Sequence, residues 1–199
     1  MEPTNIVFDF GGVLMQHDRQ GCLKVLRQLL ADEDITNILG FGNDRPDTLR
    51  HRFELGRCDA RFFLDQVLTH CKKGTTEQQF IDAWNTIHAG IPDSVWERLA
   101  QLRSNGYRLY LMSNTDDIHW QHTRSLYADR MERLFEGVFL SFKEGIVKPD
   151  EAFFREVSRR IDDAQTWFVD DMEINRLAAE KCVRWRTCAS VDELINKLI

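Results

Sequence analysis

Four polar clusters follow short apolar runs in this 199-residue chain, and together their residue types could transfer a phosphoryl group. The clusters are Asp9 with Gly11-Gly12, Ser113-Asn114, Lys148, and Asp170-Asp171. A carboxylate such as Asp9 can act as a nucleophile. The hydroxyl, amide and backbone N–H groups of Ser113 and Asn114 are suited to hydrogen-bond phosphate oxygens. Phosphoryl transfer needs mainly an in-line nucleophile and charge neutralisation, so this set predicts that chemistry.

Charge neutralisation would come from a cation on each side of the nucleophile. Lys148 is a mobile point charge that can neutralise both Asp9 and the transferring group. Asp170-Asp171 supplies hard oxygen ligands, and Mg²⁺ typically binds one or two carboxylates together with substrate phosphate and water. Because Gly11 and Gly12 have no side chains, the backbone there can approach a bound anion or metal closely.

Each cluster taken alone also has an ordinary structural explanation. Asp9, Ser113-Asn114 and Asp170-Asp171 could each cap a helix, and Lys148 could be a solvated loop residue. The functional interpretation is favoured because all four strand ends carry reactive or phosphate-binding residue types.

The elements that would position these residues alternate between strands and helices. Predicted buried strands cover residues 6–8, 108–112, 137–140 and 167–169, with a fifth at 183–187, and helical periods fill most intervening segments after residue 92. This alternation predicts an α/β fold with a doubly wound, Rossmann-like parallel sheet. The carboxyl ends of its strands share one edge, where ligands bind.

A helical segment interrupts this alternation after the first strand. From Asp18 to His88 the apolar residues recur at helical spacing, with no convincing strand. The sequence therefore predicts a core domain of residues 1–17 and 89–199, and an inserted helical domain of residues 18–88.

Composition narrows the class of protein. A net charge of −6 and a pI near 5.5 give no electrostatic footprint for nucleic acid or anionic membrane. No apolar stretch has membrane-spanning length, and the Met-Glu-Pro-Thr start does not resemble a signal peptide. The five scattered cysteines are predicted to be reduced thiols, so we expect a cytoplasmic protein. His119-x-x-His122 has metal-ligand spacing, but without a third ligand nearby it is interpreted as a surface feature. Oligomeric state is not predicted.

In this order the clusters resemble the four motifs of the haloacid dehalogenase superfamily of hydrolases, over nearly the whole chain. The matching stretches are Phe8-Asp9-Phe10-Gly11-Gly12-Val13, Leu111-Met112-Ser113-Asn114, Lys148-Pro149, and Val169-Asp170-Asp171 with Asn175. The resemblance implies that Asp9 is the nucleophile and a Mg²⁺ ligand, and that the Gly11 carbonyl is a second ligand. It implies Asp171 as the main acidic ligand with Asp170 close by. Residues 18–88 match the position of the family's C1 cap, which selects the substrate.

More narrowly, the chain is similar to bacterial sugar-phosphate phosphatases active on α-D-glucose 1-phosphate. The supporting stretches are Phe53-Glu54-Leu55-Gly56, Leu111-Met112-Ser113-Asn114-Thr115 and Phe168-Val169-Asp170-Asp171. This resemblance implies a Mg²⁺-dependent phosphomonoester hydrolase of a small phosphorylated metabolite, with an aspartyl-phosphate intermediate on Asp9.

The first motif departs from the family pattern at Gly11, where the family usually has a second Asp that acts as general acid and base. A general acid typically contributes roughly 10²–10⁴-fold to rate, so the sequence predicts a slow enzyme, a good leaving group, or a substitute donor such as His17. Two alternatives stay open. A metal-free dehalogenase would leave Asp170-Asp171 without a use, and a non-catalytic phospho-ligand-binding protein would not explain Asp9 with Lys148.

Overall fold

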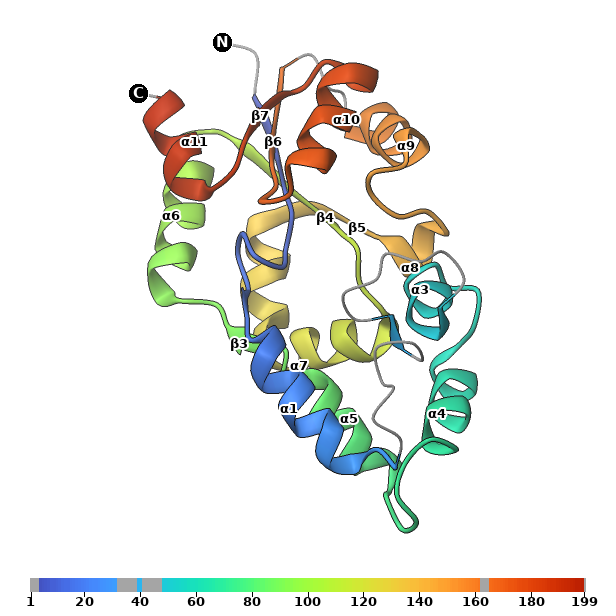
Figure 1. Cartoon of the computed structure of the whole chain (residues 1–199). Helices are drawn as coiled ribbons and strands as arrows, with labels where there is room; N and C mark the ends of the chain where they lie inside the picture. The colour runs from blue at the N-terminus through green and yellow to red at the C-terminus, as the bar shows by residue number, and fades with distance from the viewer. Residues whose placement is uncertain (1–3, 32–38, 41–47, 162–164, 199) are drawn as a thin grey trace.

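A five-stranded parallel sheet forms the centre of the fold (Figure 1). The computed structural model describes residues 4–31, 39–40, 48–161 and 165–198. The strand order is β5-β4-β1-β6-β7. These strands are β1 (Asn5–Phe8), β4 (Arg108–Ser113), β5 (Phe135–Leu140), β6 (Thr166–Val169) and β7 (Arg186–Cys188). The predicted α/β fold with a doubly wound parallel sheet is confirmed.

Helices cover both faces of this sheet. All four residues of β1 are buried, as a strand covered on both faces requires. Ile6 and Phe8 face the side covered by α6 (Asp93–Ser104), α7 (Asp117–Leu134) and α11 (Val191–Leu198). Val7 faces the opposite side, with α9 (Glu151–Ile161) and α10 (Glu173–Val183). Figure 1 shows these two layers on either side of the strands.

The register brings the strand ends to one level. Phe8 is paired with Leu111 of β4 and with Val169 of β6. The backbone N–H of Asp9 donates to the Val169 carbonyl at 2.8 Å. Asp9 and Asp170 therefore emerge from adjacent strands at the same edge of the sheet.

In the described part of the chain between β1 and α6, four helices form a second packed unit, below the sheet in Figure 1. They are α1 (Arg19–Leu29), α3 (Leu49–Glu54), α4 (Ala60–Leu68) and α5 (Glu77–Asn85). Each begins at a side chain that accepts a hydrogen bond from the helix backbone, a cap that typically stabilises a helix by about 1 kcal/mol. The caps are Asp18, Thr48, Asp59 and Thr76. Their own core contains Phe53 stacked on Phe63 at 4.4 Å between ring centroids, and Trp84.

A short antiparallel ribbon joins this unit to the sheet. It consists of β2 (Gln16–His17) and β3 (His88–Gly90), with His17 paired to His88. The Asp18 N–H also donates to the Ile87 carbonyl at 2.9 Å. The prediction that no strand lies between Asp18 and His88 is therefore wrong at its last residue, because two- and three-residue strands carry no readable alternation.

Two other differences concern element boundaries. The predicted loop after β5 contains a short helix, α8 (Ser141–Glu144), which ends at Gly145 with a left-handed φ of 73°. The strand predicted from residue 183 begins at Arg186, because α10 continues to Val183 and Arg184 then adopts a left-handed conformation. Pro46-Asp47, whose residue types are typical of a helix start, lies outside the described residues.

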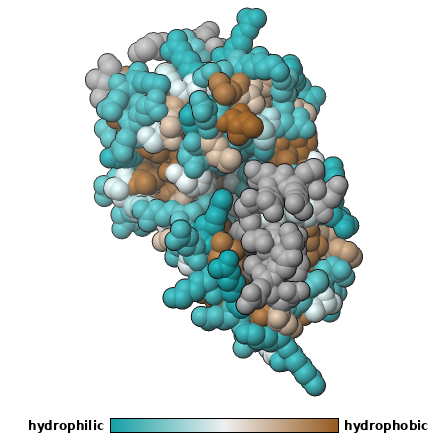
Figure 2. Space-filling model, viewed as in Figure 1, coloured by the Kyte–Doolittle hydropathy of each residue, from teal (hydrophilic) through white to brown (hydrophobic). Residues whose placement is uncertain are grey.

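The visible surface is mostly hydrophilic, with brown apolar groups gathered mainly over the sheet-containing half (Figure 2). Exposed large apolar side chains include Met172, Ile174 and Leu177 around the start of α10. Within the described ranges, no helix combines the length and hydropathy needed to cross a membrane.

Candidate active site

Three charged side chains form a buried ion-paired group at the ends of β1 and β6. Lys148 Nζ lies 2.8 Å from Asp9 Oδ1 and 2.7 Å from Asp170 Oδ2. The Lys148 and Asp170 side chains are 1% and 0% exposed, and that of Asp9 is 12% exposed. Buried charges are tolerated when they are paired at hydrogen-bond distance. Three residues that the sequence predicted for the site, separated by up to 161 positions, therefore meet there.

One oxygen of Asp9 is left available by this arrangement. Asp9 Oδ1 accepts hydrogen bonds from Lys148 Nζ and from the Phe10 N–H, at 2.8 and 2.7 Å. Asp9 Oδ2 accepts none from the described residues. The Asp9 carboxylate is thus held through one oxygen and can present the other to a ligand.

Asn114 fixes the backbone of Lys148. Its Nδ2 donates to the Lys148 carbonyl, and the Lys148 N–H donates to Asn114 Oδ1, both at 2.8 Å. Sequence analysis predicted Asn114 as a phosphate ligand and did not predict this positioning role. Because the amide is occupied on both sides, Asn114 orients the lysine whatever else it contacts.

Asp170 is held by a second set of donors. Asn175 Nδ2 donates to both carboxylate oxygens at 3.0 Å, and the Met172 N–H donates to Asp170 Oδ1 at 2.9 Å. Arg176 Nη1 donates to the carbonyls of Asp170 and Asp171 at 2.7 and 3.0 Å. The loop after β6 is therefore fixed by the first turn of α10.

Asp171 completes a cluster of three carboxylates that could hold a metal ion. Ligand oxygens of Asp9, Asp170 and Asp171 all lie within 4.8 Å of one another. The Asp171 carboxylate lies against Gly12, where a Cβ would be 2.5 Å from Asp171 Oδ2. Gly12 also has a left-handed φ of 81°, so both its backbone and its surroundings require a glycine.

The pKa values of Asp9, Lys148 and Asp171 are all raised, but for different reasons. Burial, with repulsion from Asp170, raises the pKa of Asp9 to about 7, although Lys148 lowers it. For Lys148, burial lowers the pKa, but attraction to Asp9 and Asp170 outweighs it and holds the pKa above its usual value. Burial and the charge of Asp170 also raise the pKa of Asp171. One lysine does not compensate three carboxylates, so the cluster favours a further cation.

Ser113 ends β4 and is 3% exposed. Its Oγ makes only a long, 3.5 Å hydrogen bond to the Asn114 carbonyl among the described residues. Its predicted role as a phosphate ligand stays a prediction. The following turn is fixed by Ser141, whose Oγ accepts from the Thr115 N–H at 3.0 Å and donates to the Thr115 carbonyl at 2.9 Å.

Gly11 is covered by the imidazole of His17. A Cβ at Gly11 would lie 2.1 Å from His17 Cε1 and 2.6 Å from Nε2. Desolvation of the ring, with the nearby charges of His119 and Arg19, lowers the pKa of His17 to about 4. His17 is thus a neutral side chain at pH 7, beside the loop that follows Asp9.

His119 is not the surface residue that its sequence spacing suggested, because it is buried against Trp84 and Asp116. His119 Nδ1 lies 2.8 Å from Asp116 Oδ2, and the rings of His119 and Trp84 stack at 5.0 Å. Burial lowers the pKa of His119, but Asp116 raises it more, and the net shift is upward. The missed signal is that Asp116 caps α7 and reaches residue 119 one turn along the helix.

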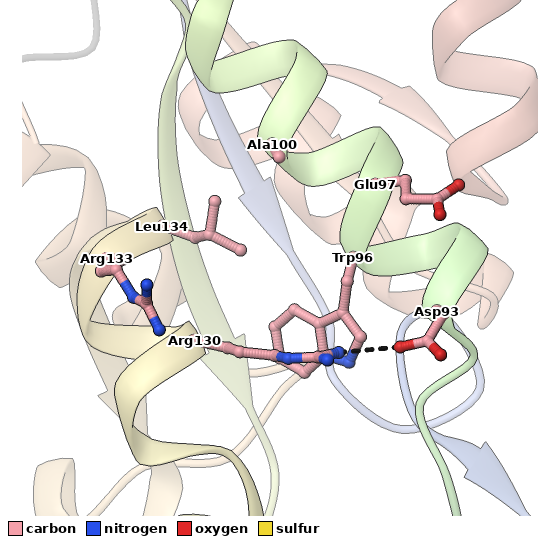
Figure 3. Close-up of a pocket in the computed structure, with 7 residues that line it drawn as sticks. All are labelled: Asp93, Trp96, Glu97, Ala100, Arg130, Arg133 and Leu134. Carbon is pink, nitrogen blue, oxygen red and sulfur yellow. Dashed lines mark hydrogen bonds and ion pairs between the residues drawn. The ribbon is translucent and has the colours of Figure 1, made fainter.

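A hollow of about 560 Å³ lies elsewhere, between α6 and α7. Figure 3 shows Arg130 flat against the Trp96 indole and ion-paired with Asp93 at 2.9 Å. None of the predicted site residues lines it, so the chemistry remains with the carboxylate cluster.

Comparisons with known proteins place the chain near phosphatases. The family model for haloacid dehalogenase-like hydrolases matches residues 4–182. The chain is 26% identical over 178 residues to the D-ribitol-5-phosphate phosphatase of Bacteroides thetaiotaomicron, covering 86% of this chain and 84% of that protein. It is 36% identical over 84 residues to the sesquiterpene phosphatase astK of Aspergillus oryzae, which is 41% of this chain and 42% of that relative.

A solved structure superimposes on a larger part of the chain than these two sequence alignments cover. The haloacid dehalogenase family enzyme bt-2542 from Bacteroides thetaiotaomicron, in complex with magnesium and inorganic phosphate, superimposes with a TM-score of 0.81 at 28% identity. The alignment covers 94% of this chain and 93% of that one. The similarity therefore includes both the sheet and the helical unit.

Proposed function

The chain belongs to the haloacid dehalogenase-like hydrolases, and from this membership we propose that it is a phosphatase of small phosphate monoesters. The observation that carries the proposal is the placement of Lys148 Nζ between Asp9 Oδ1 and Asp170 Oδ2, with Asp171 beside them. The similarity to two named phosphatases supports it.

Asp9 is the nucleophile in this proposal. Its free oxygen, Oδ2, bonds to phosphorus while the bond to the leaving alcohol breaks, which gives an aspartyl-phosphate. Water then hydrolyses that intermediate and restores the carboxylate. Lys148 holds Asp9 in place and offsets its charge, and the Ser113 hydroxyl and the backbone at Gly12 hold phosphoryl oxygens.

The carboxylate cluster fits Mg²⁺, since its three oxygen donors are close together and such hard ligands suit that ion. Asp9, Asp171 and the Gly11 carbonyl would hold it, with Asp170 close by and itself fixed by Lys148. When bound, Mg²⁺ supplies positive charge that offsets repulsion between the carboxylates and the phosphate. The magnesium and phosphate in bt-2542 support this assignment.

We propose residues 18–88 as a cap that selects the substrate. Their own hydrophobic core and their attachment through the β2-β3 ribbon support a unit separate from the sheet. The proposed substrate is a sugar phosphate, such as glucose 1-phosphate, or a sugar-alcohol phosphate. The similarity to the D-ribitol-5-phosphate phosphatase supports this class of substrate. All five cysteines are free thiols, which supports the cytoplasmic location expected from the sequence.

Phosphate release from a panel of sugar phosphates, with Mg²⁺ or with EDTA, tests the proposal. We expect release that requires Mg²⁺ and that is lost in Asp9→Asn. Release of halide from 2-haloacids without metal would instead support the dehalogenase alternative. Binding of phosphate esters with no turnover would support the non-catalytic one.

A further inference from the structure

The His17 imidazole occupies the volume that a side chain at position 11 would fill. The edge of the ring that carries Nε2 faces Gly11. It lies so close that a Cβ at position 11 would clash with the ring. Gly11 is two residues beyond Asp9, on the loop that leaves β1. A side chain from a different strand thus covers the loop that follows Asp9.

The ring is held by stacking. His17 and His88 are paired across the β2-β3 ribbon, and their rings stack at 5.6 Å with an interplanar angle of 13°. Phe10 contacts His88 edge-on at 6.4 Å. In the described part of the chain no hydrogen bond engages the ring nitrogens of His17, and the side chain stays open to solvent on one side.

The proposed reaction needs a hydrogen-bond donor near the leaving oxygen. As the ester bond to phosphorus breaks, negative charge develops on the leaving oxygen. Lys148 is already paired with the carboxylates of Asp9 and Asp170. Asp171 belongs to the carboxylate cluster that would hold Mg²⁺, so it is not free to act as a donor to that oxygen. An imidazole offers at least one N–H donor in either protonation state.

We propose that His17 is a catalytic residue that donates a hydrogen bond to the leaving oxygen of the phosphate ester. This inference rests on the proposed phosphatase function. Asp9 Oδ2 forms its bond to phosphorus as the phosphorus–oxygen bond of the ester breaks. The electron pair stays on the leaving oxygen, which keeps the His17 hydrogen bond and takes a proton from water. His17 itself does not change charge.

Such a bond matters more when the leaving group is poor. A leaving alcohol of high pKa carries more negative charge in the transition state, so a donor aimed at that oxygen contributes more. A phenol with electron-withdrawing groups needs little help. Dependence on the leaving group therefore separates this role from a structural one, which would affect all esters alike.

The test compares His17→Ala with the wild-type protein on glycerol phosphate and on p-nitrophenyl phosphate, both with Mg²⁺. We expect kcat/KM to fall about 10²-fold for glycerol phosphate, as for loss of one transition-state donor, and only a few-fold for p-nitrophenyl phosphate. His17→Gln, which keeps an N–H donor, should recover part of the loss. His70→Ala, an exposed histidine of the helical unit, is the matched control and should leave both rates unchanged.

Gly11→Ala provides an independent variant, since its Cβ would displace the His17 ring. We expect the same selective loss, and little additional effect of Gly11→Ala in the His17→Ala background, because the clash is then gone. A uniform loss for both esters, or additive effects in the double variant, would refute the proposed role of His17. The proposed phosphatase function would still stand. If the wild-type protein released phosphate from neither ester, the proposed function would fail together with this inference.

Discussion

Lys148→Met removes the only cation that pairs with the carboxylates of Asp9 and Asp170 in the described structure, while keeping most of the side-chain volume. The two carboxylates would then be buried side by side, with Asp170 fully inaccessible. Breaking a buried ion pair typically costs about 3–5 kcal/mol. We expect a loss of that size in the free energy of unfolding at pH 8 in the absence of metal.

The loss should depend on pH with a definite sign. Burial already raises the pKa of Asp9 to about 7 in the folded protein, against an ordinary value of 3.8. A raised folded-state pKa contributes stability that is present below pH 3.8 and is lost as the pH rises through 7. Because Lys148 lowers the pKa of Asp9, that pKa rises further without it, so the variant should lose much more stability at pH 8 than at pH 5.

Urea unfolding in EDTA at both pH values measures this difference. Lys143→Met is the matched control, because Lys143 is exposed and lies five residues away on the same connection. A Lys148→Met protein as stable as the control at pH 8, or destabilised equally at both pH values, would refute the electrostatic account of this cluster.

Three further substitutions test the supporting contacts. Asn114→Ala removes both hydrogen bonds to the Lys148 backbone, and we expect about 1–3 kcal/mol less stability in urea unfolding and a slower enzyme that keeps the native fold. His119→Gln breaks the buried pair with Asp116. Because that pair raises the His119 pKa, its stabilisation is full below pH 6.5 and is lost at higher pH, so thermal melts should show a larger deficit at pH 6 than at pH 9. Gly12→Ala places a Cβ on a left-handed residue against the Asp171 carboxylate. We expect about 1–2 kcal/mol of destabilisation and weaker Mg²⁺ dependence of phosphate release. Wild-type stability and Mg²⁺ dependence would contradict the close contact between Gly12 and Asp171.

The parts of the site that lie at strand ends could be predicted from the sequence. Branched and aromatic residues define β1 and β6, and the rule for parallel sheets then brings Asp9 and Asp170 to one edge. Lys148 was singled out by its residue type and its place in the motif order. Its ion pairs to both carboxylates appear only in the folded structure.

Other features depend on contacts between distant segments and could not be predicted. His17 lies over Gly11 because it pairs with His88, 71 positions along the chain, in strands too short to show a period. The clamp of Asn114 on Lys148 joins two loops after different strands. His119 is a partial exception, since Asp116 one turn earlier signals a buried pair.

The most direct test of the account is the mass of the Asp9 peptide after brief reaction with a phosphate ester in Mg²⁺ and an acid quench. We predict that this peptide gains the mass of one phosphoryl group, and that no modified peptide forms with EDTA or in Asp9→Asn. Turnover with an unmodified Asp9 peptide, or with full activity in Asp9→Asn, would contradict the proposed nucleophile.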